Sequence, residues 1–179
     1  RFEENLLDTT NAFAKYVEDE AELKGLPADV LQAAREAAEQ DGKAGFKFTL
    51  HAPSWMPIMQ YADNRALREE MYRAYATRAS EFGKPEWDNT PLIAQILKLR
   101  QEAAHMLGFK SYAEVSLATK MAEQPAQVLD FLNQLAKRAR PFAERDLAEV
   151  RAFAREKFGI ADVQAWDISS YSEKLREEK

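Results

Sequence analysis

The chain has 179 residues, of which 46% are hydrophobic and 31% charged, with only 6 Gly and 7 Pro. This composition excludes collagen-like, linker-like and disordered chains and predicts a packed globular protein. With 30 acidic and 25 basic residues the net charge is −5. Charge therefore favours neither nucleic acid nor an anionic membrane surface as a partner.

The sequence contains no Cys. This excludes disulfides, thiol catalysis and thiolate metal sites and suits a reducing compartment, so we expect a cytoplasmic protein. No apolar run approaches the roughly 18 residues of a membrane-spanning helix, and the N-terminus lacks the order of a signal peptide. The chain begins at Arg1 and ends in a helix-like stretch, Ser172 to Lys179. We therefore expect an excerpt from a longer protein.

The first half of the chain predicts three helices and one strand. Apolar residues at helical spacing predict a helix over residues 2–23, and Pro27 then begins a second helix that continues to Gln40. Residues 46–50 alternate apolar and polar side chains, which predicts a short strand. Pro53 and Pro57 make the stretch after this strand either irregular or a single helical turn. A cap at Asp63 and Asn64 then begins a helix to about Phe82.

The second half predicts longer helices. Thr90 before Pro91 begins a helix that lasts to Met106, and the spacing of Ser111 and Glu114 predicts a capping box. Residues 125–158 form the longest pattern, with Pro141 inside it, so we expect one helix with a kink. The same capping-box spacing, from Ser170 to Glu173, predicts the start of a last helix.

Together these elements predict a mainly helical, all-α fold with one short strand or hairpin near residues 46–50. No period of 20 to 50 residues recurs, so an array of equal repeats is not supported. No low-complexity linker divides the sequence. The sequence therefore indicates a single helical region over residues 1–179 and assigns no internal domain boundary.

Metal ligands are scarce, because His51 and His105 are the only imidazoles. Glu102 and His105 have the Glu-x-x-His spacing that places two ligands on one helix face in di-iron bundles. Such a site needs a second pair, but Phe48 stands three residues before His51. The alternative, a plain surface or core-edge pair, fits better. No zincin motif is present either, because neither His has a partner four residues away.

Nucleophilic and phosphate chemistry have no better candidates. There is no Cys and no Gly-x-Ser-x-Gly elbow, and Gly42 and Gly45 are too few for a phosphate cradle. The sequence therefore predicts no catalytic, cofactor-binding or metal-binding residue in this chain. Two segments remain as weak binding candidates: the aromatic stretch 46–61, which is either a peptide groove or ordinary core, and the basic cluster 137–140, which is either a solvated helix face or a set of ion pairs.

Several short segments have recognisable sequences, and they occur in order along nearly the whole chain. They are Asn64–Tyr75 (NRALREEMYRAY), Ile96–Arg100, Leu107–Glu114 (LGFKSYAE), Leu117–Pro125 (LATKMAEQP), Val128–Leu132, Lys137–Pro141, Trp166–Ile168 and Tyr171–Lys174. Together they resemble the thimet oligopeptidase family of zinc metallopeptidases, and most of all its bacterial members.

The resemblance implies a parent enzyme in which a His-Glu-x-x-His helix and a later Glu hold zinc and activate water. It also implies short peptides as substrates, hydrolysed in a deep channel between two largely helical lobes. No residue of this sequence matches the zinc motif, which lies farther toward the C-terminus in the family. We therefore expect a helical stretch of channel wall that binds no zinc and is inactive alone.

Two further hypotheses remain open. The first is a stand-alone, non-enzymatic helical module for binding or scaffolding. The second concerns an excised piece, whose helices would expose apolar stripes once separated from the rest of a larger fold. Such a fragment would form a non-native dimer through those stripes.

Overall fold

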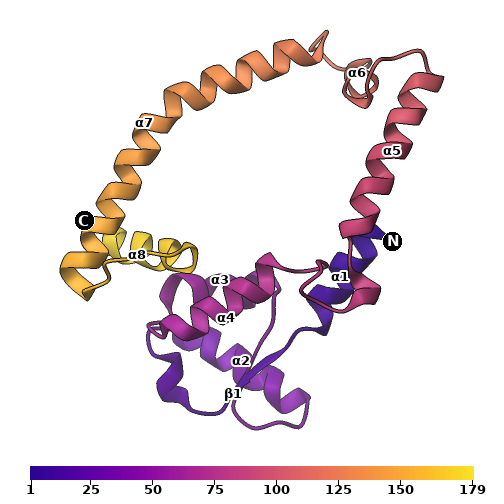
Figure 1. Cartoon of the computed structure of the whole chain (residues 1–179). Helices are drawn as coiled ribbons and strands as arrows, with labels where there is room; N and C mark the ends of the chain where they lie inside the picture. The colour runs from indigo at the N-terminus through magenta and orange to yellow at the C-terminus, as the bar shows by residue number, and fades with distance from the viewer. The chain divides into compact units, whose positions relative to one another are not determined.

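A computed structural model describes all 179 residues and is mainly helical, which confirms the predicted fold class (Figure 1). The helices are Phe2–Ala12 (α1), Ala28–Gln40 (α2), Ala52–Tyr61 (α3), Arg65–Ala76 (α4), Thr90–Met106 (α5), Tyr112–Leu117 (α6), Pro125–Phe158 (α7) and Ala165–Glu177 (α8), with 3-10 turns at Glu20–Leu23 (η1) and Pro85–Trp87 (η2). The strands are Lys15–Val17 (β1) and Phe46–Phe48 (β2).

The chain forms two compact units. One contains residues 1–89 and 150–179, and the other contains residues 90–149. Helix α7 belongs to both, because its last nine residues lie in the first unit. None of the helices combines the length and the apolar character that crossing a bilayer requires.

The core of the first unit lies between the two-stranded sheet and helices α2, α3 and α4. β1 and β2 pair antiparallel, with Tyr16 opposite Lys47. Phe46 and Phe48 point to the same side, as alternate residues of a strand must, and both are buried under α2. Helices α3, α4 and α8 pack on one another (Figure 1). The buried apolar residues here are Val17, Leu23, Leu26, Ala34, Phe46, Phe48, Leu50, Ile58, Met59, Ala62, Leu67 and Met71.

The prediction of one helix over residues 2–23 was wrong beyond Ala12. The chain there is extended and forms β1, and a 3-10 turn capped by Asp19 follows. Val17 is 4% exposed because it faces the core, and the β2 strand supplies its hydrogen-bonding partner. Pairing with a strand about thirty residues away therefore overrides the local helical spacing.

Helix α1 is held by a buried pair of amides that no local pattern reveals. Asn5 Nδ2 donates to Asn89 Oδ1 at 2.9 Å, and Asn89 Nδ2 donates to the carbonyl of Phe2 at 2.9 Å. Both asparagines are buried. A buried amide is costly unless it is paired, so this exchange of hydrogen bonds fixes α1 beside the segment that ends at Asn89.

The stretch with Pro53 and Pro57 was predicted to be irregular or a single helical turn, but it forms the ten-residue helix α3. Pro53 lies in the first turn, where its missing N–H has no helical partner to lose. Pro57 lies inside the helix and removes one backbone hydrogen bond. The burial of Ile58 and Met59 in the core offsets that loss.

Two predicted helix boundaries also differ. Helix α4 begins after the Asn64 cap as predicted, since Asn64 Oδ1 accepts from the Leu67 N–H at 3.2 Å, but it ends at Ala76 rather than Phe82. The chain turns soon afterwards, where Ala79 adopts a positive φ of 50°. Helix α8 begins at Ala165 rather than Ser170, which lies fully buried inside it.

The second unit follows the sequence prediction closely. α5 has the predicted bounds, and the Ser111 hydroxyl accepts from the Glu114 N–H at the start of α6. The Glu114 carboxylate reaches back one residue farther than a capping box requires, to the N–H of Lys110 at 2.7 Å. Residues 125–158 form one helix with Pro141 inside it.

Candidate functional site

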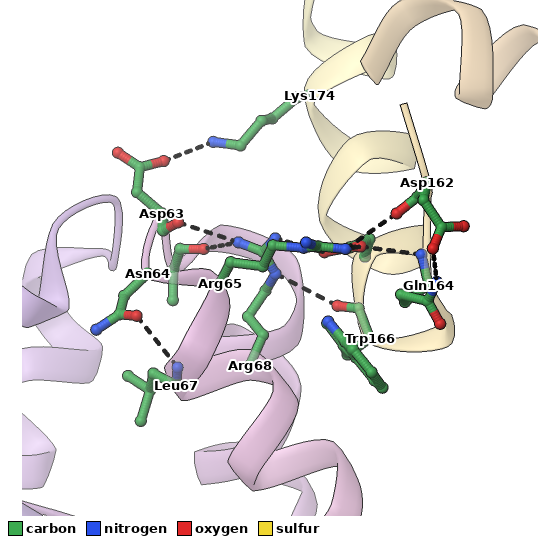
Figure 2. A network of polar contacts seen from close by, with 11 residues as sticks. Asp63, Asn64, Arg65, Leu67, Arg68, Asp162, Gln164, Trp166 and Lys174 are labelled. Atoms are coloured by element: carbon green, nitrogen blue, oxygen red, sulfur yellow. Dashed lines mark hydrogen bonds and ion pairs between the residues drawn. The ribbon is translucent and has the colours of Figure 1, made fainter. Parts of the chain in front are cut away.

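A buried network of ion pairs and hydrogen bonds joins α4 to α8 (Figure 2). Its centre is Asp167, whose side chain is fully buried. Arg65 donates to this carboxylate from Nη2 at 2.7 Å and from Nε at 3.0 Å, and Arg68 donates from Nη2 at 2.9 Å. We call these three residues the Asp167 clamp.

Arg68 is buried as completely as its partner, with 1% of its surface exposed. Its remaining donors reach backbone carbonyls: Nη1 donates to Ala62 at 2.7 Å and Nε donates to Trp166 at 3.3 Å. The guanidinium also lies 5.6 Å from the centre of the Tyr171 ring. A buried charge is tolerated only when it is paired and hydrogen-bonded, and Arg68 meets both conditions.

Local sequence places these groups. Arg65 and Arg68 stand three residues apart in the first turn of α4, so both project from the same helix face. Asp167 is the third residue of α8, and its Oδ2 accepts from the N–H of Gln164 at 3.0 Å, which caps the helix. One carboxylate therefore caps α8 and docks that helix on α4.

The charge environment favours the ionised form of Asp167. Burial by itself raises the pKa of the carboxyl, but the hydrogen bonds from Arg65, the Gln164 N–H and Arg68 outweigh burial and hold the pKa below its ordinary value of 3.8. The same contact with Asp167 raises the pKa of Arg65. Asp167 and Arg65 therefore both favour their charged forms.

Further contacts surround the clamp. Lys174 Nζ lies 2.9 Å from Asp63 Oδ1, and the Tyr61 hydroxyl donates to Glu173 at 3.4 Å (Figure 2 shows the Lys174 pair). The Trp166 ring packs against Tyr72, with ring centres 6.1 Å apart. These contacts all join α8 to α3, α4 or the segment between them. Like the clamp, they therefore hold α8 against these helices.

The arrangement suits a structural role better than catalysis. Both carboxylate oxygens of Asp167 accept hydrogen bonds from protein donors, and the side chain has no exposed surface. A catalytic carboxylate must reach the proton or atom that it acts on. Asp167 is engaged with its neighbours, so the clamp holds helices in place rather than a substrate.

The Glu102 and His105 pair does not converge on a third ligand. Both residues are exposed, with Glu102 beside Lys98 at 3.9 Å and His105 Nε2 within 2.6 Å of the Gln101 side chain. His51 is exposed at the start of α3. No group of three or more His, Asp or Glu side chains in the chain is arranged to hold a metal ion.

The aromatic stretch 46–61 is mostly core. Trp55 stacks on Tyr75 with ring centres 4.2 Å apart, and its Nε1 donates to the carbonyl of Met71 at 3.1 Å. Beside this stretch lies a small apolar pocket of about 170 Å³, between α2 and the segment from Lys47 to Ser54. Of the large apolar side chains in residues 46–61, only Met56 is strongly exposed, at 48%.

The basic cluster 137–140 lies on the exposed part of α7. Arg140 pairs with Glu144 one turn later at 2.7 Å. Successive residues of a helix point about 100° apart, so the three basic side chains do not share one face. An ion-paired helix surface describes them better than a single anion-binding patch.

Replacing Asp167 by Asn will destabilise the first unit strongly, because the buried Arg68 guanidinium keeps its charge and loses its counter-ion. We expect a loss of about 3–5 kcal/mol in the free energy of unfolding, measured by urea denaturation at pH 7. The matched control is Asp146→Asn, which removes an exposed carboxylate beside Arg145. That change costs at most about 1 kcal/mol. Equal effects of the two variants would contradict the clamp.

The stability that Asp167 supplies will also depend on pH. Because its folded-state pKa is below 3.8, this stability is fully present above that pH and declines as the pH falls through the lower folded value. The difference in unfolding free energy between the wild type and Asp167→Asn is therefore constant from about pH 5 to pH 7 and narrows below about pH 3.8. Urea titrations across this range measure it. A difference that widens in acid would overturn the assignment.

Comparison with known proteins places the chain among peptidases. A family model described as "Peptidase family M3" matches residues 58–179 of the chain. The chain is 54% identical over 179 residues to the Oligopeptidase A of Escherichia coli and 53% identical to that of Haemophilus influenzae, covering 99% of this chain and 26% of each relative. It is 43% identical to the Probable cytosolic oligopeptidase A of Arabidopsis thaliana, over 100% of this chain and 26% of the relative.

The chain thus spans about a quarter of the length of these relatives. The family match itself covers α4 to α8 completely, including all three residues of the Asp167 clamp. Since that match extends over more than half of the sequence, this chain belongs to peptidase family M3.

Proposed function

We propose that this chain is part of a zinc metallo-oligopeptidase that hydrolyses short peptides inside a channel, and that it forms helical wall of that channel. The observation that carries the proposal is the identity of 53% and 54% to two proteins named Oligopeptidase A across 99% of the chain. Identity over the full length of this chain supports a shared role for this portion of the polypeptide.

The residues of this chain do not fit a zinc site. His51 stands alone at the start of α3, and His105 contacts Gln101 rather than a carboxylate. We therefore infer that zinc ligands and the water-activating base come from another portion of the longer protein. Zinc there supplies Lewis acidity and an activated water. The contribution of this chain is a rigid framework, which the Asp167 clamp holds together.

A channel wall selects substrates by size without any reactive group of its own. Helices fixed by buried contacts keep an opening of constant width, which admits an extended peptide and excludes a folded protein. We further propose a cytoplasmic location for the whole enzyme. The name of the Arabidopsis relative, Probable cytosolic oligopeptidase A, and the absence of Cys support it.

The proposal is tested with two proteins. One is the 179-residue chain itself, purified from a host that lacks oligopeptidases. The other is a chimera of the Escherichia coli Oligopeptidase A in which this chain replaces the matching quarter. We expect the chain alone to bind no zinc and to leave a quenched fluorescent peptide intact. The chimera should bind zinc and cleave the peptide, and a chelator should abolish that cleavage.

Chelator-sensitive cleavage by the 179-residue chain alone would contradict the assignment of all catalytic residues to another portion. A chimera that folds and binds zinc but fails to cleave peptides would contradict the peptidase role. The coding region beyond Lys179 separates the remaining alternative. A downstream His-Glu-x-x-His supports the enzyme, whereas a start at Arg1 and a stop codon after Lys179 support a stand-alone helical module.

A further inference from the structure

Helix α7 carries an apolar stripe that nothing covers. Its members follow one another at intervals of four, three, four and three residues, which places them on one face of the helix. They are Val128, Leu132, Leu135, Ala139 and Phe142, which we call the bare stripe. Leu132, Leu135 and Phe142 are 50%, 53% and 60% exposed, and every residue from 129 to 146 is exposed.

The same helical spacing continues into a part of α7 that is covered. Val150 and Phe153 follow Phe142 by eight and eleven residues, so they fall on the same face by helix periodicity. They are 8% and 7% exposed and pack with Tyr171 of α8. By the same periodicity Asp146 lies on this face between Phe142 and Val150, so the bare stripe and the part that packs on α8 are two apolar segments of one helix face with a charged residue between them.

A long helix with an uncovered apolar face needs a partner. Single exposed apolar residues are ordinary on protein surfaces, but a contiguous stripe marks an interaction site. Helices in proteins owe most of their stability to the packing of such a face. An open apolar surface formed by Met121, Val128 and Phe131 lies at the start of the stripe.

The spacing indicates what the partner looks like. Alternating steps of three and four residues form the seam of two helices that cross at about 20° and interlock their side chains. Arg138 and Arg145 stand seven residues apart along one edge of this seam. Lys137 and Arg140 point away from it, by helix periodicity. Arg145 already pairs with Asp146, so Arg138 is the residue of this edge that favours an acidic group. The partner is thus a helix with an apolar seam and a carboxylate that faces Arg138.

We propose that the bare stripe docks an α-helix from the part of the longer polypeptide that lies outside these 179 residues. The relatives match this chain over 99% of its length while the chain covers 26% of theirs, so about three quarters of such a protein is available to supply that helix. The inference rests on membership of the family and does not require the proposed activity.

A second copy of this chain fits the stripe less well. In an antiparallel pair, the edge with Arg138 and Arg145 would face the same edge of the other copy, and the like charges would repel. In a parallel pair, Arg138 would face Ala143, five residues later on the partner. Neither arrangement supplies the carboxylate that an arginine edge favours.

The test exploits the absence of Cys from this chain, which makes an introduced thiol unique within it. Leu135→Cys places a thiol in the bare stripe, and the control Lys137→Cys places one on the opposite face. Each substitution is made in the 179-residue chain and in the Escherichia coli chimera described above. The rate of reaction with a soluble thiol reagent is then measured, with peptide mapping to locate the labelled residue.

We expect the Leu135→Cys thiol to react roughly tenfold or more slowly in the chimera than in the isolated chain, because only local opening would expose it there. The Lys137→Cys thiol should react at similar rates in both. Unfolding of the chimera would speed both reactions, so it cannot imitate protection. Equal rates for Leu135→Cys in the two proteins would overturn the proposal. Slow labelling in the isolated chain that disappears on dilution would assign the stripe to a second copy instead. Neither labelling rate depends on peptidase activity, so this test stands apart from that of the proposed function.

Discussion

The packing of the first unit depends on one buried carboxylate. Asp167 carries a full negative charge without any exposed surface, and such a charge is stable only with compensating partners. Two arginines from α4 and a backbone amide from its own helix provide them. The excess positive charge is spread over carbonyl oxygens at the end of α3 and in α8. Any arrangement that separates α8 from α4 would remove the carboxylate that neutralises Arg68.

The elements that the sequence predicted correctly are those whose signals are local. α5 has a proline and a capping residue at one end and a glycine beyond the other, and α7 keeps its apolar spacing across Pro141. Such signals act within a few residues, so they survive in any tertiary context. The elements that were predicted wrongly depend on contacts between residues far apart in the sequence. β1 exists because β2 pairs with it, and α3 tolerates Pro57 because the core covers its apolar side chains.

The clamp was beyond local prediction for the same reason. Arg65 and Asp167 are separated by 102 positions, and neither residue stands out in its own segment. The signal that sequence alone offered was the position of Asp167 three residues after Gln164, which permits a capping box. The predicted start at Ser170 missed it, because a serine cap is the stronger statistical signal. In the structure Ser170 lies inside α8 and is fully buried.

The two units differ in how they bury their charged and apolar side chains. The first unit pairs the buried charges of Arg68 and Asp167 internally, and the second leaves apolar side chains of α7 exposed. The clamp fixes α8 on α4, so the rigidity of the first unit depends on it. The direct measurement is a double-mutant cycle on Arg68→Met and Asp167→Asn by urea denaturation at pH 7. We predict a coupling of about 2–3 kcal/mol, with the double variant more stable than the sum of the single effects. Asp167→Asn strands the buried Arg68 charge, and Arg68→Met removes that charge, whereas Asp167 keeps Arg65 as its partner in Arg68→Met. Additive effects, within about 0.5 kcal/mol, would contradict the clamp.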